Sequence, residues 1–239
     1  MRTKLRAIRI AKILFYICGL HHVVRPFSGA LITLGHMGLL GRTLATLKGR
    51  PNVERLGWSA QRTPREALYR VVLDDLGAAP FDYLEFGVFH GRSLRWWVEH
   101  ATHAGNRFHG FDTFSGLPED WGPYKAGDMS TADRMPRFDD ARVTLWKGLF
   151  QDTVPGFLAQ WTGDRRKVVH LDADLYTSTL YVLTMLHARL RPGDILLFDE
   201  YAVPDHEFLA LKNYAESYRV QYEVIGSRNN GLFFAVRIR

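Results

Sequence analysis

From residue 81 to residue 201, apolar runs of strand length alternate with helix-compatible segments. The five runs are FDYLEFGV (81–88), NRFHGFDTF (106–114), RVTLWKGLF (142–150), KVVHLDADL (167–175) and GDILLFDEY (193–201). Strands that alternate with helices form βαβ units, and such units build a parallel sheet. The alternation therefore predicts an α/β fold with a doubly wound, mostly parallel sheet.

Two further strand-like runs follow a helix-compatible segment near residues 204–218. They are RVQYEVIG (219–226) and GLFFAVRI (231–238), and SRNNG joins them. Because Asn-Gly favours a two-residue hairpin turn, the last strand is expected to run antiparallel to its neighbour.

The length and the cysteine content limit the domain organisation. A chain of 239 residues with 46% hydrophobic residues can bury one large core. We expect a catalytic domain over residues 61–239 and a helical extension over residues 1–60. The single cysteine, Cys18, excludes an intramolecular disulfide framework, which favours a reducing cytoplasm.

The basic residues are concentrated at the N-terminus. Residues 1–50 contain no acid and nine of the Lys and Arg residues, and subtracting these nine from the net charge of +6 leaves −3 for residues 51–239. Since the cations avoid the expected catalytic body, nucleic-acid binding is disfavoured.

The N-terminal extension contains two helix-compatible stretches, residues 5–20 and 27–48. Neither offers about 20 uninterrupted apolar residues, so a membrane-spanning helix is not expected. Basic and apolar residues are predicted on opposite sides of the first helix: Arg2, Arg6, Arg9 and Lys12 against Ile10, Ile13, Leu14, Ile17 and Leu20. A helix of this kind could bind peripherally to the inner face of an anionic membrane, with residues 1–48 making the contact. Alternatively, it packs on the catalytic domain or on a second subunit of a homo-oligomer, as a lid.

The end of the first predicted strand has the residues of a ligand-binding loop. In LEFGVFHGRS, the acid Glu85 precedes Gly87 and Gly91, and Ser93 opens a helix. Glycines allow a close backbone approach to a ligand, and a helix N-terminus favours an anion. The second strand ends at Asp112, and a carboxylate in this position can accept the hydroxyls of a ribose.

Carboxylates also end the fourth and fifth predicted strands. Asp172 and the pair Asp199 and Glu200 should meet at one edge of a parallel sheet. Oxygen ligands of this kind suit Mg²⁺ or another hard divalent cation. Asp174 could instead support the following helix. The pair Asp172 and Asp174 also forms a D-x-D pattern, which leaves a metal-dependent glycosyltransferase that uses a nucleotide-sugar as the alternative function.

Five ordered motifs resemble the macrocin and mycinamicin type of sugar O-methyltransferases, a group of class I S-adenosylmethionine-dependent enzymes. The motifs are YLEFGVFHGRS, GFDTFSGLPEDW, KGLFQDTVP, LDADLYTSTL and GDILLFDEY. The resemblance implies a seven-stranded, Rossmann-like sheet with S-adenosylmethionine over its first two strands. It implies that Glu85, Gly87 and Gly91 line the methionine end, Ser93 binds the methionine carboxylate, Asp112 binds the ribose and Gly148 lies near the adenine. The implied metal ligands are Asp172, Asp199 and Glu200.

The expected reaction is metal-dependent transfer of a methyl group to a hydroxyl of a sugar, a glycoside or a similar diol-bearing small molecule. The sulfonium donor is already activated, so the task of the enzyme is to position and deprotonate the acceptor. The candidate bases are Asp172, Asp174 and His206, whereas His170, inside a strand, is expected to be a packed core histidine.

Overall fold

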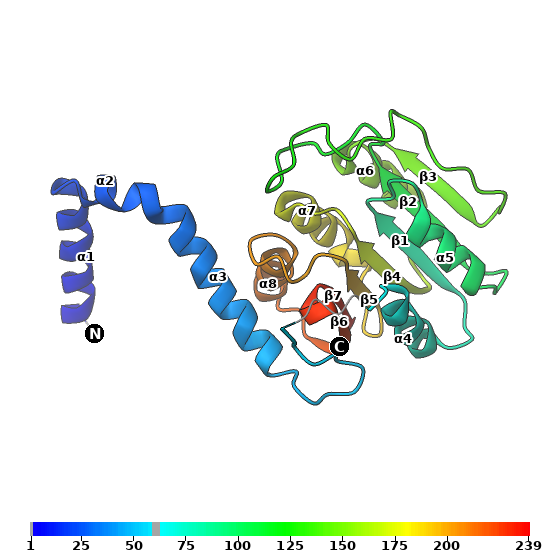
Figure 1. Cartoon of the computed structure of the whole chain (residues 1–239), viewed down its shortest axis with the longest axis horizontal. Coiled ribbons are helices and arrows are strands. Elements are labelled where there is room, and N and C mark those ends of the chain that lie inside the picture. The colour runs from blue at the N-terminus through cyan, green and yellow to red at the C-terminus, as the bar shows by residue number, and fades with distance from the viewer. Residues whose placement is uncertain (1, 59–62) are drawn as a thin grey trace.

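The structure of the chain is a computed structural model that describes residues 2–58 and 63–239. Its centre is one sheet of seven strands (Figure 1). The strands are β1 (Phe81–Phe86), β2 (Arg107–Asp112), β3 (Val143–Lys147), β4 (Arg166–Leu171), β5 (Ile195–Phe198), β6 (Tyr222–Arg228) and β7 (Phe233–Ile238). Each of the seven predicted runs therefore overlaps a strand.

The order and directions of the strands confirm the predicted fold class. The order is β3-β2-β1-β4-β5-β7-β6. All pairs among β1 to β5 are parallel, while β7 is antiparallel to both β5 and β6. The turn between β6 and β7 is a short 3₁₀ helix, Asn229–Gly231, at the position where Asn-Gly predicted a hairpin.

Helices cover both faces of the sheet, as a doubly wound fold requires. One buried cluster joins the sheet to α4 (Glu66–Leu76) and α5 (Arg92–His100). A second cluster joins the opposite face to α6 (Phe150–Gln160), α7 (Tyr176–Leu186) and α8 (Glu207–Tyr218). The sheet is therefore buried on both sides, and its strand ends remain as the place where a ligand can bind.

The N-terminal helices form an arm that extends away from this body (Figure 1). The arm consists of α1 (Arg2–Ile17), α2 (Leu20–Val24), a 3₁₀ turn (Arg25–Phe27) and α3 (Ser28–Ala45). Only the end of the arm joins the core, where Leu40 and Leu47 are buried in the α6–α8 cluster. The expectation that the first helix packs on its own catalytic domain is therefore wrong for α1 in this structure, because its apolar side chains remain exposed.

The structure also revises the expectation for a membrane-spanning helix. Among the described residues, Leu20–Ala45 forms one helical segment of 26 residues that is long and apolar enough, by length and composition only, to cross a membrane. The helix-compatible stretches expected from the sequence, residues 5–20 and 27–48, left residues 21–26 between them. The backbone instead continues through Arg25 and Pro26 as a 3₁₀ turn, with the proline near the start of that turn.

A buried ion pair aligns the beginnings of β4 and β5. Lys167 Nζ lies 3.0 Å from Asp194 Oδ2, and the backbone N–H of Lys167 donates to Asp194 Oδ1 at 2.9 Å. Both side chains are almost fully enclosed. The register that this pair stabilises determines which residues stand at the opposite ends of β4 and β5.

Replacing Lys167 by methionine should leave the Asp194 carboxylate buried without its cation. We expect the free energy of unfolding to fall by about 3–5 kcal/mol, measured by urea denaturation. The control is Lys212→Met, which removes a surface i,i+4 pair with Glu216 and should cost about 0.5 kcal/mol. Equal losses for the two variants would show that the buried pair has no special structural role.

Candidate active site

Backbone hydrogen bonds continue past the strand ends and hold the candidate loops together. Beyond β1, the N–H of Gly87 donates to Phe111 O at 2.9 Å, and beyond β4 the N–H of Asp172 donates to Phe86 O at 2.9 Å. Similar bonds join Gly148 to Asp112 O and Asp199 to Leu171 O. The predicted residues at the ends of β1 to β5 therefore lie along one edge of the sheet, as expected.

Gly87 is required by a close approach between two of these loops. Its φ of 98° is in the region that favours glycine, and a Cβ at this position would lie 1.8 Å from the carbonyl oxygen of Asp172. A side chain at residue 87 would thus displace the backbone that carries Asp172. The glycine of the predicted cofactor loop also positions the predicted metal ligand.

Asp112 organises the loop that follows β1. Its Oδ2 accepts the backbone N–H groups of Val88 and Phe89, each at 2.7 Å, and its Oδ1 accepts the N–H of Phe114 at 2.6 Å. These bonds fix the carboxylate at the carboxyl end of β2. A carboxylate has about four acceptor positions, so one remains for a hydroxyl of a ligand.

Glu85 and Ser93 form a buried pair. Ser93 Oγ donates to Glu85 Oε1 at 2.6 Å, and Tyr83 OH donates to Glu85 Oε2 at 2.6 Å. Glu85 has no exposed surface, and its carboxylate holds the hydroxyls of Ser93 and Tyr83 in place. Ser93, expected to bind a carboxylate of the cofactor, bonds to the Glu85 carboxylate in this structure.

The two other predicted cofactor glycines both have positive φ. Gly91 precedes α5 with a φ of 74°, and a Cβ there would lie 2.9 Å from Pro136 Cγ. Gly148 follows β3 with a φ of 141°. The cofactor roles of all these residues remain predictions, and the structure adds that they belong to one connected edge.

The carboxylates at the ends of β4 and β5 do come together. Donor atoms of His170, Asp172 and Asp199 lie within 4.8 Å of one another, the group among the described residues with a geometry that could hold a metal ion. A cation of the protein lies at this pair: Arg65 Nη1 is 3.2 Å from Asp172 Oδ2 and 3.0 Å from Asp199 Oδ2. Arg65 immediately precedes α4.

Glu200, the third predicted metal ligand, is not part of that group; His170 takes its place. The reason is the direction of the chain, because consecutive residues at a strand end project differently and the backbone N–H of Glu200 is held by Glu207 Oε2 at 2.9 Å. Burial, with Asp199 and Asp174 nearby, raises the pKa of Glu200 to about 7. Glu200 is therefore close enough to Asp199 and Asp174 for their charges to act on it.

His170 is a buried strand residue, as expected, but it also belongs to the polar site. Its Nδ1 lies 2.7 Å from Tyr83 OH and its Nε2 lies 3.8 Å from Asp199 Oδ1. Burial alone would lower the pKa of His170, but the carboxylates of Asp199 and Glu85 beside the ring outweigh it and raise the pKa to about 9. The imidazolium then partly neutralises the acidic cluster.

The candidate bases differ in their surroundings. Burial and the Asp199 carboxylate raise the pKa of Asp174 to about 7, close to the value that suits proton transfer at neutral pH. Burial lowers the pKa of His206, which precedes α8 and has a buried Nδ1 without a protein partner. Asp172 forms an ion pair with Arg65. Asp174 and His206 are therefore better placed than Asp172 to accept a proton.

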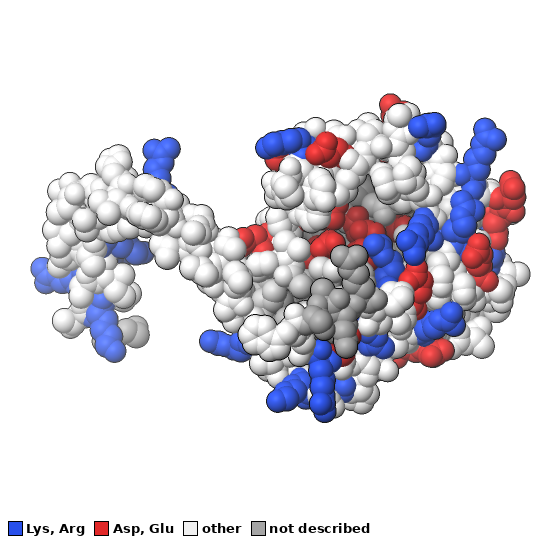
Figure 2. Space-filling view, viewed as in Figure 1, with Lys and Arg blue, Asp and Glu red and all other residues white. Residues whose placement is uncertain are grey.

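The donor set fits a hard divalent cation. Asp172 and Asp199 supply oxygen atoms at the ends of adjacent strands, and burial together with the Asp199 carboxylate raises the pKa values of Asp174 and Glu200 beside them. Figure 2 shows acidic side chains gathered at the centre of this face of the body. Arg65 must move for a metal to contact both carboxylates.

Arg65 and His170 are the residues that sequence reasoning missed as parts of the site. Arg65 lies 107 residues from Asp172 in the sequence, and no local pattern connects them. His170 could have been identified, since residues two apart in a strand point to the same face and Asp172 is two residues further.

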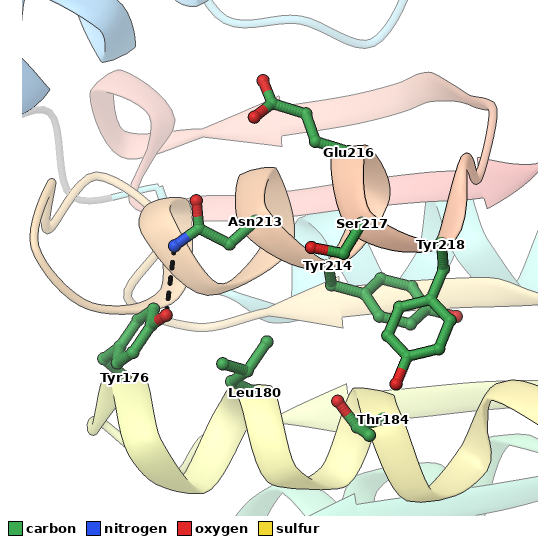
Figure 3. A pocket seen from close by; sticks show the side chains of 8 residues that line it. All are labelled: Tyr176, Leu180, Thr184, Asn213, Tyr214, Glu216, Ser217 and Tyr218. Atoms are coloured by element: carbon green, nitrogen blue, oxygen red, sulfur yellow. Dashed lines mark hydrogen bonds between the residues drawn. The ribbon is translucent and has the colours of Figure 1, made fainter.

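A groove of about 460 Å³ lies elsewhere, between α7 and α8 (Figure 3). Tyr176 and Asn213 are joined across it by a 3.0 Å hydrogen bond, and Tyr218 lies at its other end. It contains none of the predicted site residues, so the strand ends remain the candidate active site.

Comparison with known proteins shows what the chain is similar to. Residues 84–201 match a family model described as a methyltransferase domain. The chain is 30% identical over 171 residues to the 8-demethyl-8-(2,3-dimethoxy-alpha-L-rhamnosyl)-tetracenomycin-C 4'-O-methyltransferase of Streptomyces olivaceus, covering 61% of this chain and 60% of that protein. It is 30% identical over 95 residues to the mycinamicin III 3''-O-methyltransferase of Micromonospora griseorubida, covering 40% of this chain and 35% of that protein. The chain therefore spans less than two thirds of either relative.

Solved structures give the same fold. The calicheamicin methyltransferase CalS11 superposes with a TM-score of 0.56 at 24% identity, over 85% of this chain and 91% of that one. The seven-stranded class I methyltransferase fold is thereby confirmed, and the two relatives confirm the resemblance to sugar O-methyltransferases. Over residues 84–201, slightly less than half of its length, the chain is therefore similar to the methyltransferase domain family.

Proposed function

We propose that the protein is an S-adenosylmethionine-dependent O-methyltransferase that acts on a hydroxyl of a sugar-bearing small molecule. The observation that supports this most strongly is the joint position of Asp112, at the end of β2, and the Asp172–Asp199 pair on one edge of a methyltransferase sheet. The names of the two curated relatives support the sugar as the acceptor class. They also favour this function over a nucleotide-sugar glycosyltransferase.

The residues at the strand ends would divide the task as follows. Asp112 would accept a ribose hydroxyl while it holds the loop after Gly87, and Ser93 would face the methionine end from the start of α5. Asp172 and Asp199 would hold a divalent cation such as Mg²⁺, which lowers the pKa of an acceptor hydroxyl when bound. Glu200 would contribute charge next to this pair.

The proton of the acceptor hydroxyl needs a base at the same edge. Asp174 and His206 are the proposed candidates, because the pKa of the first is raised to about 7 and that of the second is lowered by burial. Asp174 therefore titrates near neutral pH, and the lowered pKa keeps His206 in the neutral form that can accept a proton.

Calorimetric titration distinguishes the two functions. We expect the protein to bind S-adenosylmethionine and its demethylated product, and not a nucleotide-sugar. Asp112→Ala should weaken cofactor binding about tenfold or more, because the ribose loses a charged acceptor. The control is Asp164→Ala at an exposed surface pair, with binding unchanged. Tight binding of a nucleotide-sugar, without binding of the sulfonium cofactor, would refute the proposal.

Arg65 and a metal ion should compete for the same two carboxylates. Replacing Arg65 by glutamine removes the cation that lies between Asp172 and Asp199, so the affinity for Mn²⁺ should rise about tenfold, measured by electron paramagnetic resonance titration. Asp172→Asn should lower it. Excess chelator should abolish methyl transfer and added Mg²⁺ should restore it.

The matched control for Arg65 is Arg165→Gln. Arg165 also pairs with a buried aspartate, Asp82 Oδ1 at 2.9 Å, but at the beginning of β1, and its removal should leave the Mn²⁺ affinity unchanged. If Arg65→Gln and Arg165→Gln behave alike, Arg65 does not compete with the metal. Full activity in excess chelator would contradict the metal assignment itself.

A further inference from the structure

The arm exposes a long apolar surface that the body does not cover. Side chains from α1, α2 and the first half of α3 are exposed, including Ile13, Ile17, Val23, Phe27, Leu31 and Leu34. Single exposed apolar residues are common, but a continuous set marks an interaction surface.

The second half of α3 shows where the contact with the body begins. Thr33 and His36 both bond to the Asp205 carboxylate, and Leu40 and Leu47 are buried further along. Among the described residues of the arm, those before Thr33 extend away from the body (Figure 1). Their apolar character needs another explanation.

The segment that contains these residues is long and largely apolar. An 18-residue window within Leu20–Ala45 has a mean hydropathy of 1.3, yet only 6% of that window is buried. An apolar helix surface is normally covered by protein or by lipid. Gly19, with a φ of 70°, separates it from α1.

The charges of the arm indicate what covers its apolar surface. Residues 1–50 contain nine cations and no acid, and Figure 2 shows basic side chains on an otherwise uncharged arm. A second arm packed against the first would add nine cations to these nine, whereas anionic headgroups would neutralise them. In α1, Ile13 lies one turn beyond Arg9, on the basic side, so the two faces are less separated than predicted.

We propose that residues 2–32 bind in the plane of an anionic lipid bilayer. The apolar stretch free of the body, residues 20–32, has a helical length of roughly 20 Å, which is shorter than the hydrocarbon core of about 30 Å. The arm therefore lies in the interface, with its apolar side chains inserted and the arginines of α1 at the headgroups.

This placement brings the bilayer close to the candidate active site. Asp205, which holds α3, belongs to the loop between Glu200 and His206. Acceptors held in the membrane are therefore the substrate class that the geometry favours, an assignment that rests also on the proposed function. Lipid binding itself does not depend on that function.

Vesicle flotation of the full chain tests the proposal. The protein should float with vesicles of phosphatidylcholine and phosphatidylglycerol at low salt, and much less with phosphatidylcholine alone. The double variant Arg6→Gln with Arg9→Gln should bind anionic vesicles roughly 10–30-fold more weakly. The matched control, Arg191→Gln with Arg219→Gln, removes two cations of the body and should bind as the unchanged chain does.

A second variant tests the apolar contact. Leu31→Glu, at an exposed position of α3, should abolish flotation while S-adenosylmethionine binding and the circular dichroism spectrum are retained. The proposal is overturned if the unchanged chain does not float with anionic vesicles. It is also overturned if the chain is a stable dimer that Leu31→Glu dissociates, because the arm is then a subunit interface.

Discussion

Two carboxylates at the ends of adjacent strands, the partly buried Asp172 and the buried Asp199, are the constraint on which the site depends. A buried charge is tolerated only when it is paired. Here Arg65 pairs with both carboxylates, and the ring of His170 lies behind them. The pair therefore fixes the start of α4 as well as the ends of β4 and β5.

The same polar network extends to the cofactor side of the sheet. His170 contacts Tyr83, Tyr83 donates to Glu85, and Glu85 accepts from Ser93 at the start of α5. Groups in such a chain hold one another in place, because each unpaired member would carry the cost of burial. The proposed donor site and the proposed acceptor site are thus parts of one rigid structure, and Gly87 joins them a second time through its contact with the Asp172 carbonyl.

The arm follows a different physical rule from the body. In the body, apolar side chains are enclosed on both faces of the sheet. In the arm they are exposed, and the basic residues are concentrated beside them. Asp205 joins the two parts at the edge of the site, so that whatever covers the arm lies close to the proposed acceptor.

The sequence by itself determined the α/β class, the seven strands and the residues at their ends, because hydrophobic periodicity and turn chemistry are local properties. It also placed Asp112, Asp172 and Asp199 correctly on one edge, since parallel strands share a carboxyl end. Only the tertiary structure decided that Arg65 lies between the carboxylates, that His170 takes the place expected for Glu200, and that α1 stays off the body. These outcomes depend on packing between segments that are far apart in the chain. Local sequence patterns cannot predict such packing.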